Sequence, residues 1–300
     1  MKGSSLKLPE NLIAINKPQE LLDLLLTQSN ISHKVYWPEK LASASPSERL
    51  KISNKTFKNF SFSNTEILNV DFTDCHFENV LFKRTSIEGC DFQRCTFKRV
   101  NTHKITISRT YINPQNFVKN YVYIEESNMA VHLFQQLLNN SKDNEQNEFA
   151  RVANYNFHKW KGILAKNKYL NKRPYSIGWG EYFTTYYLNI VYRFTFGYGL
   201  RLRNFILSFA VVFLLSFITN CLFWQDYKLL CKDINIDAFD ASSANFSANF
   251  FYTVDCTTKI IDSQFQPSSN LGMFIAIAEG GLSLVCFTFL ITILQNKYVK

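Results

Sequence analysis

The sequence lacks the short motifs that mark most catalytic and metal-binding sites. It contains no HExxH pair, no CxxC pair and no glycine-rich phosphate loop. Its five histidines are scattered without the spacing of metal ligands, at the positions His33, His76, His103, His132 and His158. We therefore expect no catalytic residue, no metal site and no cofactor, and we expect that the protein is not an enzyme.

A secretory leader is also missing, because the first residues, MKGSSLKLPENLIAINK, contain no continuous apolar run after the first lysine. The amino terminus is accordingly expected in the cytoplasm. The formal net charge is +9, which favours an anionic partner such as nucleic acid, a nucleotide or lipid headgroups. Aromatic residues, in contrast, are abundant, with 28 Phe and 15 Tyr.

The sequence does contain a ladder of large apolar residues with a step of five. Its rungs, interrupted only by Thr102, are Phe57, Phe62, Ile67, Phe72, Phe77, Phe82, Ile87, Phe92, Phe97, Ile107 and Ile112. Neither an α-helix nor a flat strand has this period, so the chain must turn a corner every five residues. From Thr65 on, the positions two before the rungs are nearly all small or β-branched; Cys75, Cys90 and Cys95 are among them, as packing residues and not metal ligands.

This ladder resembles the pentapeptide-repeat family. The resemblance implies a right-handed, four-sided β-helix over residues 50–117, and four rungs per turn give about three coils. A post that short needs caps at both ends. We expect an amino-terminal helical cap over residues 1–49 with an amphipathic helix from Pro18, and helices at Met129–Asn140 and Glu148–Lys166 that form a hairpin.

Residues 177–203 mix aromatic with polar side chains and end in a basic cluster. This composition favours a helix that lies along the inner headgroup layer of a membrane. The alternative is an aromatic-rich docking surface on the helical hairpin. Together with the hairpin, this segment forms a predicted region over residues 118–203.

Two later segments, Phe205–Trp224 and Leu271–Leu294, are long and apolar enough to cross a bilayer. Basic residues precede the first and follow the second, so both termini are expected inside. The loop between them is acidic, and Asp255 is assigned to an outward mouth that concentrates permeant cations. Whether a disulfide forms among Cys221, Cys231 and Cys256 is left undecided by the sequence.

Within that loop, the helix-compatible stretch Ser243–Val254 is apolar but too short to span. A re-entrant pore helix fits both properties. Residues 204–300 would then form one subunit of a channel, and one such subunit cannot enclose a pore.

Here the chain resembles the two-transmembrane, potassium-channel-like pore family, through FFYTVDCTT before the filter and GMFIAIAEGGLSLVCFTFLI in the second span. The resemblance implies a homotetramer in a bacterial inner membrane, a filter strand at the axis and an inner gate in the second span. The filter-equivalent residues are Thr257, Thr258, Lys259, Ile260, Ile261 and Asp262. Because both glycines of the family signature are replaced, we expect a poorly selective pore.

The second span contains the ionisable residue Glu279, which is costly in a membrane and marks function by default. The favoured interpretation is local: Glu279 hydrogen-bonds the pore helix behind the filter. Gly280 and Gly281 would allow a bend or a close helix contact. Residues at spacings of four from Glu279 share its face, namely Ser283, Phe287 and Ile291; if that face is axial, the last two would form a hydrophobic gate.

Neither span has the regularly spaced arginines of a voltage sensor, so we expect gating by a ligand. In a four-sided helix, residues twenty apart stack in adjacent coils. One such face has no acidic residue and consists of Ser63, Asn64, Lys83, Arg84, His103 and Lys104. It suits the phosphates of a nucleotide or a short single-stranded nucleic acid, although it could also be an ordinary solvated basic side.

The combination of a soluble repeat domain with a pore is similar to effector channels of bacterial anti-phage systems, including those of the Hailong type. The resemblance implies antiviral defence controlled by an oligonucleotide signal. The rival interpretation is a non-conducting, membrane-anchored scaffold for protein interactions.

Overall fold

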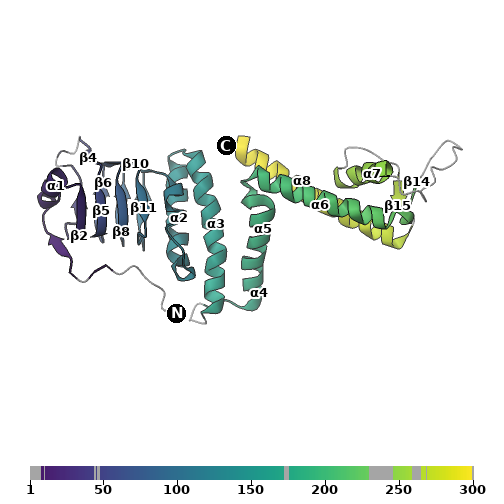
Figure 1. Cartoon of the computed structure of the whole chain (residues 1–300), viewed down its shortest axis with the longest axis horizontal. Coiled ribbons are helices and arrows are strands. Elements are labelled where there is room, and N and C mark those ends of the chain that lie inside the picture. Colours follow the sequence, from purple (N-terminus) through teal and green to yellow (C-terminus); the bar gives the residue numbers. More distant parts are fainter. Residues whose placement is uncertain are drawn as a thin grey trace. The chain divides into compact units, whose positions relative to one another are not determined.

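The computed structural model describes residues 8–9, 11–43, 45, 48–171, 176–229, 246–258, 265–267 and 269–298 (Figure 1). The chain divides into two compact units, Met1–Ile190 and Val191–Lys300.

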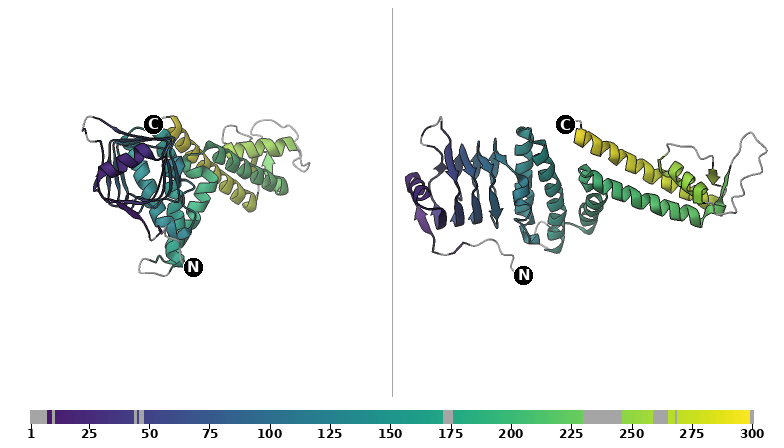
Figure 2. Two further views of the ribbon diagram at one scale, coloured as in Figure 1. Left: turned by 60° about the vertical axis from the view of Figure 1, so that its left-hand side comes forward. Right: turned by 45° about the horizontal axis from the view of Figure 1, so that its top comes forward.

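The first unit is a β-solenoid with parallel sheets on three of its sides. The first sheet has the order β1 (Ile13–Ile15), β2 (Asn30–Tyr36), β5 (Thr56–Ser61), β8 (His76–Leu81), β11 (Thr96–Lys98). The second contains β13 (Tyr111–Ile112), β10 (Asp91–Gln93), β7 (Val70–Thr73) and β4 (Leu50–Ser53), and the third β12 (Thr106–Ser108), β9 (Ser86–Glu88), β6 (Glu66–Leu68) and β3 (Lys40–Leu41). The left view of Figure 2 shows the superposed coils.

Each coil of the ladder contains twenty residues. Phe57 pairs with Phe77 and Phe77 with Phe97, and the fourth side is formed by Ser61, Leu81 and Asn101 at the same spacing. The predicted four-sided repeat is thereby confirmed.

The rungs fill the core of the solenoid as the period predicts. Phenylalanines of successive coils stack nearly face to face, with ring centroids 5.2 Å apart for Phe57 and Phe77 and 5.0 Å apart for Phe77 and Phe97. The thiols at Cys75, Cys90 and Cys95 are buried and free, which confirms their packing role. Thr102, which interrupts the ladder of apolar residues, is also buried, and its hydroxyl is hydrogen-bonded to the Tyr121 hydroxyl.

The corners explain how the chain turns every five residues. The residue two positions after each rung has a positive φ, from Asn54 through Arg109 without exception. Asn and Asp tolerate this left-handed conformation best and occupy the first six corners, Asn54 through Asn79. Of the last six, Gly89 is the only glycine, and the other five are basic: Arg84, Arg94, Arg99, Lys104 and Arg109.

The solenoid begins earlier than residue 50, where the ladder was expected to start. Ile31 pairs with Phe57 and Leu41 with Ile67, so the first coil has 26 residues between equivalent positions instead of twenty. The extra residues lie between β3 and β4, since Ile52 already pairs with Phe72 at the regular spacing. The helix expected from Pro18 is present as α1 (Pro18–Thr27) and buries Leu21.

The carboxyl-terminal end of the solenoid is covered by η1 (Pro114–Phe117), η2 (Ile124–Glu126) and the hairpin of α2 (Ser127–Asp143) and α3 (Asn147–Leu170). At this end of the solenoid, side-chain amides form the hydrogen bonds that the backbone of a further coil would form. Asn120 accepts from the Val100 amide and donates to its carbonyl, at 2.7 and 2.9 Å, and Asn140 does the same to Thr110 at 2.9 and 2.7 Å. The sheet edge is therefore closed, and the predicted hairpin cap is confirmed.

The chain then continues through α4 (Trp179–Tyr182), the π-helix η3 (Phe183–Tyr187) and α5 (Leu188–Phe196). Beyond the turn η4 (Gly197–Gly199), the second unit contains α6 (Leu202–Leu222), η5 (Trp224–Asp226), β14 (Tyr227–Leu229), α7 (Phe246–Thr258), β15 (Phe265–Pro267) and α8 (Asn270–Tyr298). Two helices are long and apolar enough to cross a membrane, Leu202–Leu222 and Asn270–Gln295, which agrees with the two predicted spans. Cys221 and Cys256 are free, and Cys231 lies outside the described residues.

Candidate functional site

The short helix α7 packs against both α6 and α8, and a buried polar seam joins the three helices. Asn220 of α6 donates from Nδ2 to Thr253 Oγ1 at 3.1 Å and to Glu279 Oε2 at 3.4 Å. All three side chains are at most 5% exposed. Glu279 is thus connected to α7 through Asn220 of α6, and the direct hydrogen bond from Glu279 to the pore helix stays a prediction.

A second contact ties the carboxyl end of α7 to α8. The Ser283 hydroxyl donates to the backbone carbonyl of Thr257, which lies in the last turn of α7. Thr257 is buried, and Thr258 and Asp255 are half-buried. The remaining filter-equivalent residues, Lys259, Ile260, Ile261 and Asp262, lie outside the described residues.

The predicted common face of α8 is divided in the structure. Glu279 and Ser283 are buried against the other helices, Phe287 is half-buried, and Ile291 is 56% exposed. The face that contains Glu279 therefore packs against the other helices of the same subunit. The gate predicted at Phe287 and Ile291 required this face to line the pore axis, and the subunit gives no support for that arrangement. A Cβ added at Gly280 or Gly281 would meet no atom within 4 Å.

The turn before α6 was not predicted from the sequence. Gly197, Tyr198 and Gly199 are three successive residues with positive φ, and a Cβ on Gly197 would lie 2.7 Å from the Arg201 Cβ. Phe196 stacks on Phe289 of α8 with centroids 3.7 Å apart. The last turn of α5 is thereby fixed to α8, and the paired glycines in GYG were the available signal.

On the solenoid, the six residues of the predicted cationic face do stack in successive coils. The Asn64 amide donates to the Lys83 carbonyl and the Arg84 amide to the His103 carbonyl, at 2.9 and 2.8 Å. We call Asn64, Lys83, Arg84, His103 and Lys104 the basic column. Within the part of the chain that the structure describes, its lysines and arginine form no salt bridge.

Electrostatics mark the basic column as a place of concentrated positive charge. Partial burial lowers the pKa of His103 below its ordinary value, and Lys104, Lys83, Arg84 and His132 lower it further. His132 comes from α2, so sequence spacing along the ladder could not reveal it. Protonation of His103 is therefore less favourable than that of an isolated imidazole.

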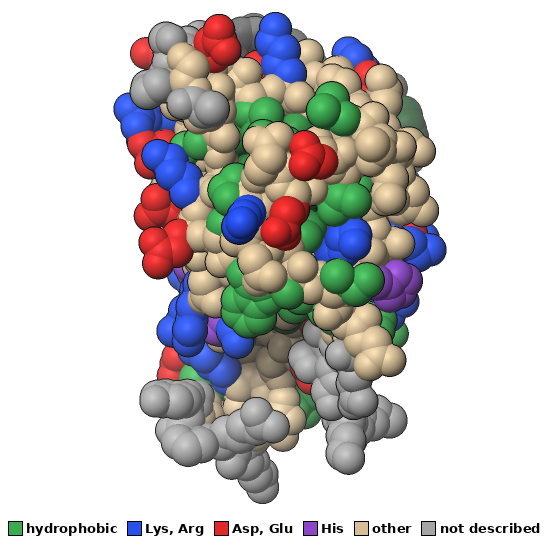
Figure 3. All heavy atoms as spheres, turned by 90° about the vertical axis from the view of Figure 1, so that its left-hand side faces the viewer, with side chains coloured by type: hydrophobic (Ala, Val, Ile, Leu, Met, Phe, Trp, Pro, Cys, Tyr) green, Lys and Arg blue, Asp and Glu red, His purple; other side chains and the backbone are tan. Residues whose placement is uncertain are grey.

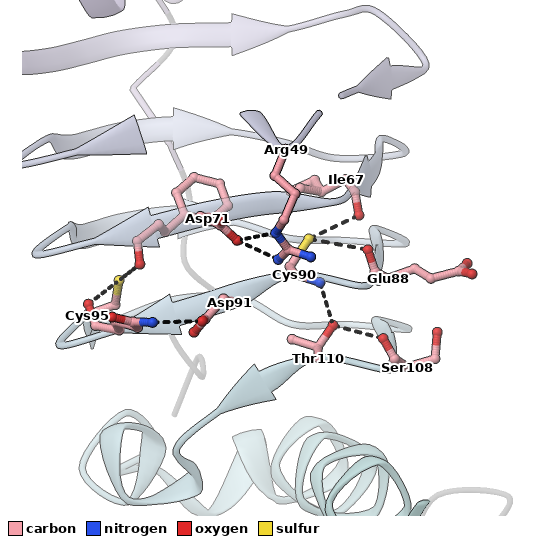
Figure 4. A network of polar contacts seen from close by, with 11 residues as sticks. Arg49, Ile67, Asp71, Glu88, Cys90, Asp91, Cys95, Ser108 and Thr110 are labelled. Carbon is pink, nitrogen blue, oxygen red and sulfur yellow. Dashed lines mark hydrogen bonds and ion pairs between the residues drawn. The ribbon is translucent and has the colours of Figure 1, made fainter. Parts of the chain in front are cut away.

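The other sides of the solenoid contain ion pairs, although Lys51 and Arg99 form none among the described residues. Figure 4 shows one of them, where Arg49 donates from Nε to Asp71 Oδ1 at 2.6 Å. Arg94 pairs with Asp74 at 2.7 Å, and Lys98 with Glu78 at 3.1 Å. The basic column therefore differs from these sides in having no acidic partner among the described residues.

Comparison with known proteins supports the first unit alone. A family model described as "Pentapeptide repeats (9 copies)" matches residues 62–106. No curated protein matches the chain. The protein thus has a pentapeptide-repeat domain with a β-solenoid fold, followed by a helical region with two candidate membrane-spanning helices.

Proposed function

We propose that this chain is a non-enzymatic subunit of a homotetrameric, poorly selective cation channel in a bacterial inner membrane, with both termini in the cytoplasm. The observation that carries the proposal is α7. Its 13 residues are too few to cross a bilayer, yet it packs against both membrane-length helices. A short helix that packs against two candidate spans supports a re-entrant pore loop, because backbone ends at membrane depth require protein or water around them.

The polar seam adds to this support. Asn220, Thr253 and Glu279 are buried among helices whose outer surfaces are apolar. Polar side chains inside a bilayer cost free energy, and where they are retained they hold in place the helices that line a pathway for ions or substrates. Here they connect α7 to both candidate spans, which supports a re-entrant helix.

Assembly follows from the number of spans, since two helices per copy cannot enclose water and closed symmetry is the usual solution. Gly280 and Gly281 each cost about 1 kcal/mol of helix propensity compared with alanine. Among the described residues of the subunit, no neighbouring atom requires either glycine. This supports a close contact of α8 with another copy, or a bend at the gate.

Ion flux through the purified full-length chain in liposomes tests the channel. We expect cation flux with reversal potentials close to zero for potassium against sodium. A strong potassium preference would contradict poor selectivity, and absence of flux would contradict the channel itself.

The gating part of the proposal places an anionic ligand, a nucleotide or a short oligonucleotide, on the basic column, as an anti-phage effector would require. Its support is that Lys83, Arg84 and Lys104 stack on one side of the solenoid and have no acidic partner among the described residues. Arg84→Glu with Lys104→Glu should abolish the response of the conductance to such signals. The control Lys51→Glu with Arg99→Glu reverses two exposed charges outside the column and should leave the response intact.

One observation favours the alternative of a membrane-anchored scaffold. Figure 3 shows exposed hydrophobic side chains between charged ones at the end of the repeat domain that contains α1. Ile13, Leu26 and Trp37 of this region are 62%, 84% and 65% exposed. If flux is absent and substitution of these three residues removes a bound protein, the scaffold would replace the channel.

A further inference from the structure

The helix formed by α4, η3 and α5 has two different faces. One face docks on α3: the rings of Tyr182 and Tyr169 stack with centroids 4.2 Å apart, and the Lys166 ammonium lies over the Tyr186 ring at 5.5 Å. Asn189 donates to the His158 carbonyl at 3.0 Å and approaches α3 so closely that a Cβ on Gly162 would lie 2.5 Å from its Oδ1. Part of this aromatic segment is thus a docking surface on the hairpin.

The other face carries a row of aromatic rings that contact one another and are exposed at the surface. Trp179 stacks on Phe183 at 5.6 Å and Phe183 contacts Tyr187 at 5.4 Å, with exposures of 67%, 44% and 47%. The π-helix explains the alignment, because its wider turns keep residues four apart nearly in line. Val191 and Phe194 follow along the helix at spacings of four and three residues and are 54% and 66% exposed.

We propose that this aromatic row lies in the headgroup layer of the membrane leaflet at which α6 begins, so that one helix joins the repeat domain to the bilayer surface. Chain continuity supports lipid as the occupant, because α6 starts six residues after α5 ends. Arg193, Arg201 and Arg203 flank this junction, and Trp and Tyr beside basic residues are typical of membrane interfaces. The proposal requires a membrane and does not require ion conduction.

The distribution of tryptophans makes the proposal testable by fluorescence. Of the four tryptophans, Trp160 and Trp224 are buried, whereas Trp37 and Trp179 are 65% and 67% exposed. The full-length protein is reconstituted into vesicles whose lipids carry bromine on acyl carbons next to the headgroup. We expect Trp179→Phe to lose lipid-dependent quenching that Trp37→Phe retains, and Trp37→Phe to lose most of the quenching by aqueous acrylamide.

Two outcomes would overturn the proposal. If acrylamide quenches Trp179 as strongly as Trp37 and brominated lipid does not, the row faces water. If neither quencher reaches Trp179, protein covers the row, and a second copy of the chain becomes its occupant. Because Trp179 is exposed, its replacement by Phe should not disturb folding, and ion flux of the same variants separates this test from that of the channel.

Discussion

The two units of the chain expose opposite kinds of side chain. The repeat domain encloses stacked phenylalanines and carries its charges outside, whereas the second unit encloses Asn220, Thr253 and Glu279 and exposes leucines such as Leu207 and Leu284 at 59% and 70%. The first arrangement gains from removing apolar surface from water. In lipid that gain vanishes, so close packing and hydrogen bonds must hold the helices together. The contrast indicates which solvent each unit is built for.

The largest expected effect therefore lies in the core of the first unit. Phe77 stacks on rings in the coils before and after it, so Phe77→Ala should leave a cavity and cost about 3–5 kcal/mol. Hydrogen exchange of β5, β8 and β11 in the full-length protein would measure the loss. Phe77→Leu, which keeps most of the volume, should cost clearly less. Equal effects of the two substitutions would contradict a core held by ring packing.

A second prediction compares a capping amide with its neighbour on α2. Asn140→Ala leaves the Thr110 amide and carbonyl without their partners, and each unsatisfied buried group costs about 1–3 kcal/mol. Asn139 is exposed, so Asn139→Ala is the matched control. Exchange of the Thr110 amide should accelerate in the first variant only. Unchanged protection in Asn140→Ala would mean that water closes this edge as well as the side chain does.

The repeat could be predicted from the sequence because a period of five residues fits only one kind of structure. An insertion that interrupts this period hides the coil that precedes it. Ile31, Tyr36 and Leu41 also follow the step of five and are buried, but the longer segment before Ile52 shifts them out of register with the later rungs. The first coil was therefore missed.

The candidate sites were predictable only where sequence spacing determines position. The twenty-residue spacing placed Lys83 and His103 together correctly, while His132 reaches them from another element. On α8, helical spacing grouped Ile291 with Glu279, but it could not tell which face the other helices occupy. The π-helix and the left-handed turn at Tyr198 depend on tertiary contacts and leave little trace in the sequence.

The third prediction probes the second contact between α7 and α8, the one formed by Ser283 and Thr257. Ser283→Ala removes the hydrogen bond to the Thr257 carbonyl and should cost about 0.5–1.5 kcal/mol, seen as a lower melting temperature of the detergent-solubilised protein. Thr288→Ala is the control, because Thr288 is exposed on the same helix and its hydroxyl donates to the Leu284 carbonyl of that helix. If both variants melt alike, the contact between α7 and α8 does not depend on this bond.

The smallest expected effect concerns the charged exterior of the repeat domain and its response to acid. Lys98 lies 3.1 Å and Lys58 3.5 Å from the Glu78 carboxylate, and the hydrogen bond from Lys98 is the main cause of a lowered Glu78 pKa. A carboxyl whose pKa is lowered by folding stabilises the fold when ionised. This contribution is present above the ordinary glutamate value of 4.5 and is lost as the pH falls through the lowered pKa.

Glu78→Gln should therefore flatten the stability curve of the full-length protein below pH 4.5 and lower stability only slightly at neutral pH, since exposed pairs contribute little. Glu66→Gln is the matched control, because Glu66 is exposed on β6 and has no ion pair among the described residues. Hydrogen exchange of β8 as a function of pH would provide the comparison. If both variants responded equally to acid, the exterior charges would not contribute to holding adjacent coils together. The stacked core alone would then distinguish this unit from the second one.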